Sequence, residues 1–178
     1  MRYHNITKDD MLNGDGLRVV LWLAGCEHHC PGCHNPVTWN AEGGLFFDEE
    51  AKAELLEILE RDYISGITFS GGDPLHPANI REVTALAAEI KAKYPGKTIW
   101  LYTGEVWENI CKEEIVQYLD VLVDGPFAEE KKNVKLLWKG SSNQRVVDVQ
   151  ASLKENRVIL HCEDYEEGEN HAQNSEIS

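Results

Sequence analysis

Three closely spaced cysteines are the residues of this 178-residue chain best suited to chemistry. Cys26, Cys30 and Cys33 form a C-x₃-C-x₂-C motif, which reads Cys26-Glu-His-His-Cys30-Pro-Gly-Cys33. Thiolates are soft ligands that favour zinc, copper(I) or iron–sulfur clusters, and cysteines this close together usually mark a metal site. The spacing therefore predicts a metal centre held by a short loop.

Two kinds of metal centre fit three thiolates. A structural zinc site usually has four protein ligands, and the candidates for the fourth are His28, His29, His34, Cys111 and Cys162. A [4Fe–4S] cluster is normally held by four cysteines, so three would leave one iron open to a bound molecule. Ligand softness favours the cluster, and zinc stays open as the alternative. Apart from these uses, we expect Cys111 to be a core residue, and His28 and His29 to be solvated.

Turn residues follow three other apolar segments that we expect to be strands. Gly71-Gly72-Asp73-Pro74 follows the first of them, Thr103-Gly104 the second and Asp124-Gly125 the third. Ligands of parallel α/β sheets bind at the carboxyl ends of the strands. We therefore expect these turns and the cysteine loop to lie along one rim.

Apolar runs alternate with amphipathic segments along the chain, which predicts βαβ units and a parallel sheet in an α/β fold. The expected strands cover residues 17–24, 66–70, 98–102, 119–123, 145–149 and 157–161. The expected helices cover residues 48–61, a segment that starts at Asn79 with Glu82 as its capping-box partner, and residues 105–118 with a break near Cys111.

The charge of the chain is strongly negative. It has 17 Lys and Arg against 31 Asp and Glu, a formal net charge of −14. This balance argues against binding to nucleic acid or to an anionic membrane. No apolar run approaches the roughly 18 to 20 residues of a membrane helix, and residues 1–5 lack the apolar segment of a signal peptide. We therefore expect a cytoplasmic protein without membrane or nucleic-acid partners.

Much of the negative charge lies at the end of the sequence. Residues 163–178 contain six acids and no Lys or Arg, which leaves a net charge of −8 for residues 1–162. The few apolar residues of this segment cannot offset the entropy of ordering it. We expect one domain over residues 1–162, followed by a disordered acidic tail.

The cysteine motif and the following Gly71-Gly72-Asp73-Pro74 together resemble the radical S-adenosylmethionine superfamily. Within it, the chain is similar to the family that activates anaerobic ribonucleotide reductases. That closer resemblance depends on five further strings: Asn13-Gly14-Asp15-Gly16-Leu17-Arg18, Cys30-Pro31-Gly32-Cys33-His34-Asn35-Pro36, Thr38-Trp39, Val123-Asp124-Gly125 and Trp138-Lys139-Gly140-Ser141-Ser142-Asn143-Gln144-Arg145. The chain departs from the superfamily pattern at Gly32, where an aromatic residue is usual, and at Asp73, where Glu is usual.

The resemblance implies a partial, open parallel β/α barrel and a role for each matching residue. Cys26, Cys30 and Cys33 would hold a [4Fe–4S] cluster, whose open iron is chelated by S-adenosylmethionine. The residues implied to contact S-adenosylmethionine are Gly32, Cys33 and His34 near the adenine, Gly71, Gly72 and Asp73 at the methionine moiety, and Thr103 and Asp124 on the ribose side. Two alternatives stay open for Ser142, Asn143 and Arg145, namely a turn and a partner-docking surface.

The resemblance also implies a reaction and its partners. One electron reaches the sulfonium from the reduced cluster, and the resulting 5′-deoxyadenosyl radical takes a hydrogen atom from a glycine Cα. The implied protein partners are the large glycyl-radical subunit of anaerobic ribonucleotide reductase and a low-potential electron donor such as flavodoxin or ferredoxin. The alternatives are activation of another glycyl-radical enzyme, a small-molecule radical reaction, or a zinc-stabilised binding module using the three cysteines and His34.

Overall fold

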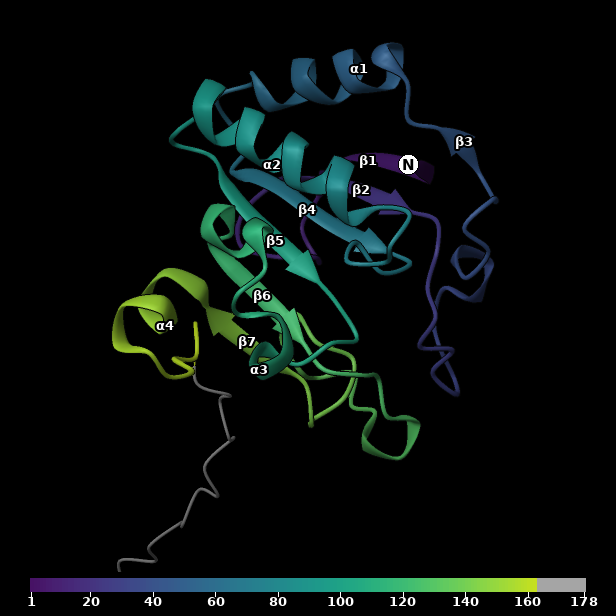
Figure 1. Ribbon diagram of the computed structural model, residues 1–178, viewed down its shortest axis with the longest axis vertical. Coiled ribbons are helices and arrows are strands. Elements are labelled where there is room, and N and C mark those ends of the chain that lie inside the picture. The colour runs from purple at the N-terminus through teal and green to yellow at the C-terminus, as the bar shows by residue number, and fades with distance from the viewer. Residues whose placement is uncertain (163–178) are drawn as a thin grey trace, which may run out of the picture.

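The computed structural model describes residues 1–162, and its strands form one seven-stranded open sheet (Figure 1). The strand order is β3-β1-β2-β4-β5-β6-β7. The strands are β1 (Arg2–Asp10), β2 (Arg18–Leu23), β3 (Leu45–Phe46), β4 (Gly66–Gly71), β5 (Thr98–Tyr102), β6 (Val121–Asp124) and β7 (Arg145–Asp148). The α-helices are α1 (Glu49–Leu59), α2 (Ile80–Lys93), α3 (Trp107–Ile110) and α4 (Val149–Glu155), and the 3₁₀ helices are η1 (Pro36–Thr38), η2 (Glu114–Tyr118) and η3 (Glu129–Lys131). The predicted acidic tail, residues 163–178, lies outside the described residues.

The sheet is mixed, so the expectation of a parallel sheet is correct only for its centre. Strands β2, β4, β5 and β6 are parallel neighbours. At one edge β1 pairs antiparallel with β2 and with β3, and at the other edge β7 pairs antiparallel with β6. A short turn joins β1 to β2, and a loop without a crossover helix joins β6 to β7. Parallel pairing needs a crossover connection, so these two connections give antiparallel pairs.

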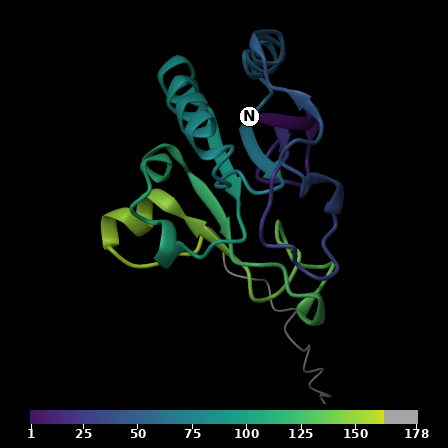
Figure 2. The same cartoon turned by 45° about the vertical axis from the view of Figure 1, so that its right-hand side comes forward.

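The helices pack on one face of the sheet, where the main hydrophobic core lies (Figures 1 and 2). Side chains of a strand alternate between the two faces. On β5, Ile99 and Leu101 belong to this core, whereas Trp100 belongs to a small second cluster on the opposite face. The opposite face is therefore covered by loops rather than helices, which leaves room there for a site.

Most predicted elements are present with small shifts of their ends, and one detail differs. Asp48 caps α1 by accepting a hydrogen bond from the Ala51 amide at 3.0 Å, as the acidic helix start predicted. The predicted break near Cys111 separates α3 from η2, and Cys111 packs against the core. The capping-box prediction for Glu82 is wrong, because this carboxylate pairs with the amino group of Met1.

The ends of the described chain also depart from the sequence-based expectations. Residues 157–161 form one isolated bridge, between Val147 and Leu160, instead of a strand. Strands β1 and β3 and helix α4 were not expected. The pattern of β1 explains the omission, because eight of its nine residues are at least partly exposed and carry no apolar alternation. Among the helices of residues 1–162, none combines the length and the apolar character needed to cross a bilayer.

Arg18 is a fully buried cation that joins three strands on the face opposite the helices. Its guanidinium donates to the Thr68 hydroxyl, to the Thr98 hydroxyl and carbonyl, and to the carbonyls of Asp15 and Ile67, all at 2.8–3.0 Å. These bonds use all five guanidinium N–H groups. Burial lowers the pKa of Arg18 to about 10. The side chain is therefore structural and lies at the amino ends of the parallel strands, away from the predicted rim.

We expect Arg18→Lys to destabilise the fold by about 2–4 kcal/mol, because a single ammonium cannot satisfy the acceptors that five N–H groups now reach. Urea unfolding followed by circular dichroism measures this change. The control is Arg81→Lys, at an exposed position of helix α2, which should stay within about 0.5 kcal/mol of the parent. Equal stabilities for the two variants would contradict the role given to Arg18.

Candidate functional site

A cavity of about 600 Å³ lies at the carboxyl ends of the parallel strands, on the face without helices. In Figure 1 the arrowheads of β2, β4, β5 and β6 point toward the side where the cysteine loop and the loop after β6 lie. The predicted site residues that line the cavity are Cys26, Cys30, Cys33, His34, Gly71, Gly72, Asp73 and Thr103. Trp22, Ser70 and Tyr102 contribute from the face of the strands opposite the helices. The topology thus brings together residues that the sequence separates by almost 80 positions.

Backbone hydrogen bonds hold the cysteine loop closed at its base. The amide of Gly25 donates to the Thr38 carbonyl at 2.7 Å, and the amide of Cys26 donates to the Trp39 carbonyl at 3.1 Å. Between these ends the chain turns so that the Cys33 amide reaches the Cys30 carbonyl at 3.1 Å. These bonds therefore define the shape of the loop that carries the three cysteines.

The three cysteines form a donor set that suits an iron–sulfur cluster. All three are half-buried and none is in a disulfide, and burial raises the pKa of the Cys26 thiol. Within residues 1–162, no three His, Cys, Asp or Glu side chains are arranged to hold one metal ion. A zinc site needs ligands that converge on a single point, whereas a cluster takes each thiolate on a separate iron. Three soft thiolates that line one cavity match a cluster with one iron left open.

The turn at Gly71 and Gly72 is fixed against the cysteine loop. The Gly72 amide donates to the Leu23 carbonyl at 2.8 Å, and the Asp73 amide donates to the Gly25 carbonyl at 2.7 Å. Gly71 has φ +101°, a conformation that favours glycine. The amides of Gly72 and Asp73 are therefore already bonded within the protein, which leaves other groups of the turn for the implied contact with the methionine moiety.

Asp73 joins the ends of two strands and the cysteine loop through one buried carboxylate, which is 3% exposed. It accepts hydrogen bonds from His28 Nε2 at 2.7 Å, the Thr103 hydroxyl at 2.9 Å, and the amides of Leu75 and Gly104 at 2.8 and 3.1 Å. The bond to Asp73 raises the pKa of His28. His28 is thus part of the site, contrary to the expectation of a solvated loop residue.

Two predicted contact residues, Gly32 and Asp124, are absent from the cavity lining. Gly32 has φ +70° and faces Glu129, since a Cβ there would lie 2.7 Å from the Glu129 carboxyl carbon. Asp124 is 1% exposed, and both of its carboxylate oxygens are bonded within the protein. Neither residue therefore contributes to the cavity lining, and contacts of Gly32 and Asp124 with S-adenosylmethionine stay a prediction.

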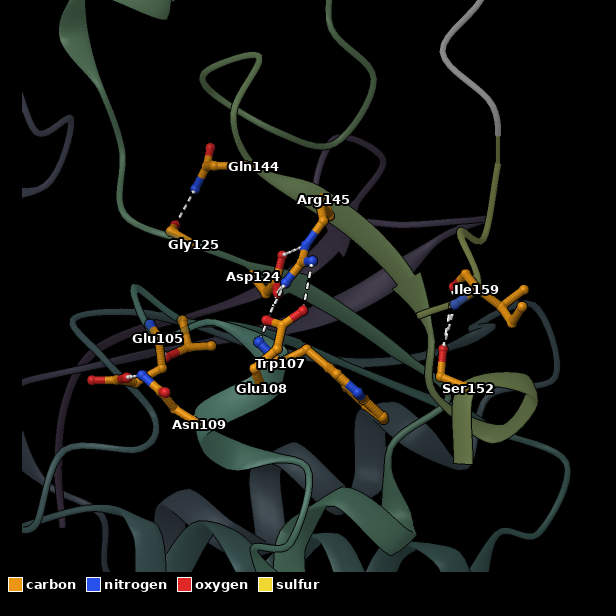
Figure 3. Close-up of polar contacts among 11 residues, drawn as sticks. Glu105, Trp107, Glu108, Asn109, Asp124, Gly125, Gln144, Arg145, Ser152 and Ile159 are labelled. Atoms are coloured by element: carbon orange, nitrogen blue, oxygen red, sulfur yellow. Dashed lines mark hydrogen bonds and ion pairs between the residues drawn. The ribbon is translucent and has the colours of Figure 1, made fainter. Parts of the chain in front are cut away.

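Asp124 instead belongs to a charged network behind the rim (Figure 3). Arg145 donates to both Asp124 oxygens, at 3.0 and 2.5 Å, and to both Glu108 oxygens, at 3.0 and 2.8 Å. The Trp107 amide donates to Asp124 at 2.8 Å. The network joins the end of β6, the start of β7 and helix α3. Arg145 lowers the pKa of Glu108 to about 2.

The loop between β6 and β7 supplies cavity residues that sequence reasoning did not assign. They are Phe127, Lys132, Asn133, Val134, Leu136, Trp138, Lys139, Gly140 and Gln144. Figure 2 shows this loop approaching the segment after β2, in agreement with the 5.5 Å separation of the His34 and Phe127 rings. The only available sequence signal was the string at residues 138–145, whose role depends on contacts that are distant in sequence.

We expect Gly72→Ala to destabilise the fold by about 1–3 kcal/mol through overpacking. Its Cβ would collide with the Gly25 carbonyl oxygen and lie 3.0 Å from that of Thr38, both of which are backbone atoms. Gly96→Ala is the matched control, because a Cβ at Gly96 meets no atom within 4 Å. Thermal or urea unfolding of the metal-free chain decides the matter, and a Gly72→Ala variant as stable as Gly96→Ala would refute this packing.

We expect Arg145→Gln to return the pKa of Glu108 from about 2 toward its ordinary value of 4.5. The pair stabilises the folded chain above pH 4.5, and this contribution is lost as the pH falls toward 2. Carbon-13 NMR of the side-chain carboxyl measures the titration. Lys93→Gln, which removes a partner of exposed Glu60, should leave Glu108 unchanged. If the pKa of Glu108 is unchanged in Arg145→Gln, a group other than Arg145 lowers it.

Comparisons with known proteins agree with this site. Residues 12–147 match the family model described as a 4Fe-4S single cluster domain. The chain is 45% identical over 146 residues to the anaerobic ribonucleoside-triphosphate reductase-activating protein of Enterobacteria phage T4, covering 82% of this chain and 93% of that protein. The proteins of the same name from Salmonella typhimurium and Escherichia coli K12 are 43% and 41% identical over 150 residues, covering 82% of this chain and 97% of each. The chain therefore belongs to the family of anaerobic ribonucleoside-triphosphate reductase-activating proteins, which carry a [4Fe–4S] cluster and use S-adenosylmethionine.

Proposed function

We propose that this chain activates the anaerobic ribonucleotide reductase by generating a glycyl radical on its large subunit. The observation that carries the proposal is the convergence of Cys26, Cys30 and Cys33 with the Gly71-Gly72 turn in one cavity. When bound, the cluster and S-adenosylmethionine supply a one-electron reductive cleavage whose product removes a hydrogen atom from a glycine Cα. The protein's own part is to bind both groups and to hold the surrounding side chains in fixed positions.

The three cysteines are the proposed cluster ligands, and the turn at residues 71–73 is the proposed edge of the S-adenosylmethionine site. The Asp73 amide donates to the Gly25 carbonyl, immediately before Cys26. This bond fixes the distance between the two parts of the site, and preorganised spacing of this kind supports reactive geometry. Asp73 acts here as a positioning residue, because its carboxylate is occupied by protein donors.

The walls of the cavity are proposed to protect a radical reaction from water. Trp22, Tyr102, Phe127, Leu136 and Trp138 contribute apolar surface to the lining. Exclusion of water limits side reactions of reactive intermediates. His34 and Thr103 also line the cavity and remain candidates for contacts to the nucleoside part of the cofactor.

The overall architecture also fits the proposed activity. We propose that the open sheet, with its helices on one face and its cavity on the other, is a partial barrel of the radical S-adenosylmethionine type formed by residues 1–162. We also propose a low-potential electron donor such as flavodoxin or ferredoxin, and a cytoplasmic setting for the reaction.

Anaerobic reconstitution tests the proposed ligands. We expect the full chain to bind about four iron and four sulfide and, once reduced, to release 5′-deoxyadenosine from S-adenosylmethionine. Cys30→Ala should lose cluster absorbance and this release. Cys111→Ala, at a cysteine packed against the core, should retain both. A colourless parent chain with one zinc, or full cleavage by Cys30→Ala, would refute the proposal.

A further inference from the structure

The loop between β6 and β7, residues 126–144, is closed on itself by side chains at its end, and we call it the rim loop. The side-chain nitrogen Nε2 of Gln144 donates to the Gly125 carbonyl at 3.0 Å, and its side-chain oxygen Oε1 accepts from the backbone amide of Gly140 at 2.9 Å. Asn143 donates to the Pro126 carbonyl at 2.8 Å. These bonds join the first residues of the loop to its last ones, as Figure 3 shows for Gln144 and Gly125.

A second set of bonds narrows the loop and fixes its base. The Ser141 hydroxyl accepts from the Ala128 amide at 3.1 Å, and the Ser142 amide donates to the Lys131 carbonyl at 3.0 Å. Directly after the loop, Arg145 holds the buried carboxylate of Asp124. The Ser-Ser-Asn-Gln-Arg string therefore preorganises the rim loop, which lowers the entropy lost when a partner binds it.

The middle of the rim loop is positive and apolar in a chain that is otherwise acidic. Residues 131–139 contain four of the 17 Lys and Arg and no Asp or Glu, although the net charge of the chain is −14. Val134 is 89% exposed and Leu137 is 50% exposed in the same stretch. Exposed apolar side chains gathered in one segment mark a candidate interaction surface, and the lysines beside them give this surface an electrostatic preference for negative partners.

The rim loop forms part of the cavity wall next to the cysteines. Lys132, Val134 and Leu136 line the same cavity as the cysteines. Leu12, which is 81% exposed, also lines it from the turn between β1 and β2. The rim loop is therefore placed to contact a molecule that lies in this cavity beside the cysteines.

We infer that the rim loop is the docking surface for an acidic, apolar-bearing segment of the reductase subunit that presents its glycine to the cavity. This inference rests on the proposed function. Hydrogen-atom removal requires contact between the reacting atoms, whereas an electron can tunnel through intervening protein. The protein substrate must therefore touch the cavity mouth and the electron donor need not. The positive charge of the lysines favours an acidic segment over a basic one. The negative charge of the rest of the chain disfavours binding of that segment elsewhere on the surface.

Binding of the full, metal-free chain to the purified large reductase subunit tests the inference without any turnover. The loop variant is Lys131→Glu with Lys135→Glu, at two exposed positions that do not line the cavity. The control is Lys112→Glu with Lys154→Glu, at two exposed positions outside the rim loop, which changes the net charge equally. We expect the loop variant to weaken binding about tenfold, and the control to change it less than twofold. Binding of the parent should also weaken with added salt.

A second variant separates loop shape from loop charge. Gln144→Leu removes the bonds that close the rim loop and leaves every lysine in place, so we expect weaker binding with an unchanged salt dependence. Circular dichroism and melting temperature verify that each variant is folded. If the loop variant binds the reductase as tightly as the control does, the rim loop is not the docking surface. That result would leave the proposed function unaffected.

The remaining outcomes distinguish this inference from the proposed function. If the parent reductively cleaves S-adenosylmethionine but neither binds nor activates the reductase, the proposed function fails. If the loop variant binds the reductase normally but is reduced more slowly by flavodoxin, the rim loop serves the electron donor and our inference is wrong. Removal of residues 163–178 gives a further test. If this removal tightens binding of the parent but not of the loop variant, residues 163–178 compete with the reductase for the rim loop. That result would support the preference of the rim loop for acidic partners.

Discussion

The buried carboxylate of Asp73 is the interaction on which the site depends. It accepts hydrogen bonds from the cysteine loop through His28, from the end of β5 through Thr103 and Gly104, and from its own turn through Leu75. A buried carboxylate without such donors would carry a large desolvation cost. The fold therefore keeps the segments together, because separating them would leave this charge unpaired.

The two faces of the sheet divide stability from chemistry. One face carries helices and most of the hydrophobic core, and the other carries a small hydrophobic cluster, Arg18 and the cavity. Arg18 joins the strands at their amino ends, and Asp73 joins them at their carboxyl ends. Because a charged group lies at each end of the same face, the strands are fixed where the site needs a rigid floor.

The central elements could be predicted from the sequence because their signals are local. Apolar runs gave β2, β4, β5 and β6 within a few residues, and the C-x₃-C-x₂-C spacing indicated a metal loop whose cysteines line one cavity with the Gly71-Gly72 turn. Strand β1 escaped because its exposed residues carry no alternation. The antiparallel pairing at the two edges was not predicted for another reason. Strand direction depends on the connections between strands, which apolar patterns do not specify.

The sequence by itself determined the type of metal ligand, the family and the succession of the central strands and helices along the chain. Only the tertiary structure decided which polar groups are occupied. Asp124 matched a family string, yet its carboxylate is held by Arg145, and His28 looked like a solvated loop residue, yet it bonds Asp73. The role of Gln144 likewise depends on a carbonyl 19 residues away. Residue type and spacing report what a side chain can bind, whereas packing of distant segments decides what it does bind.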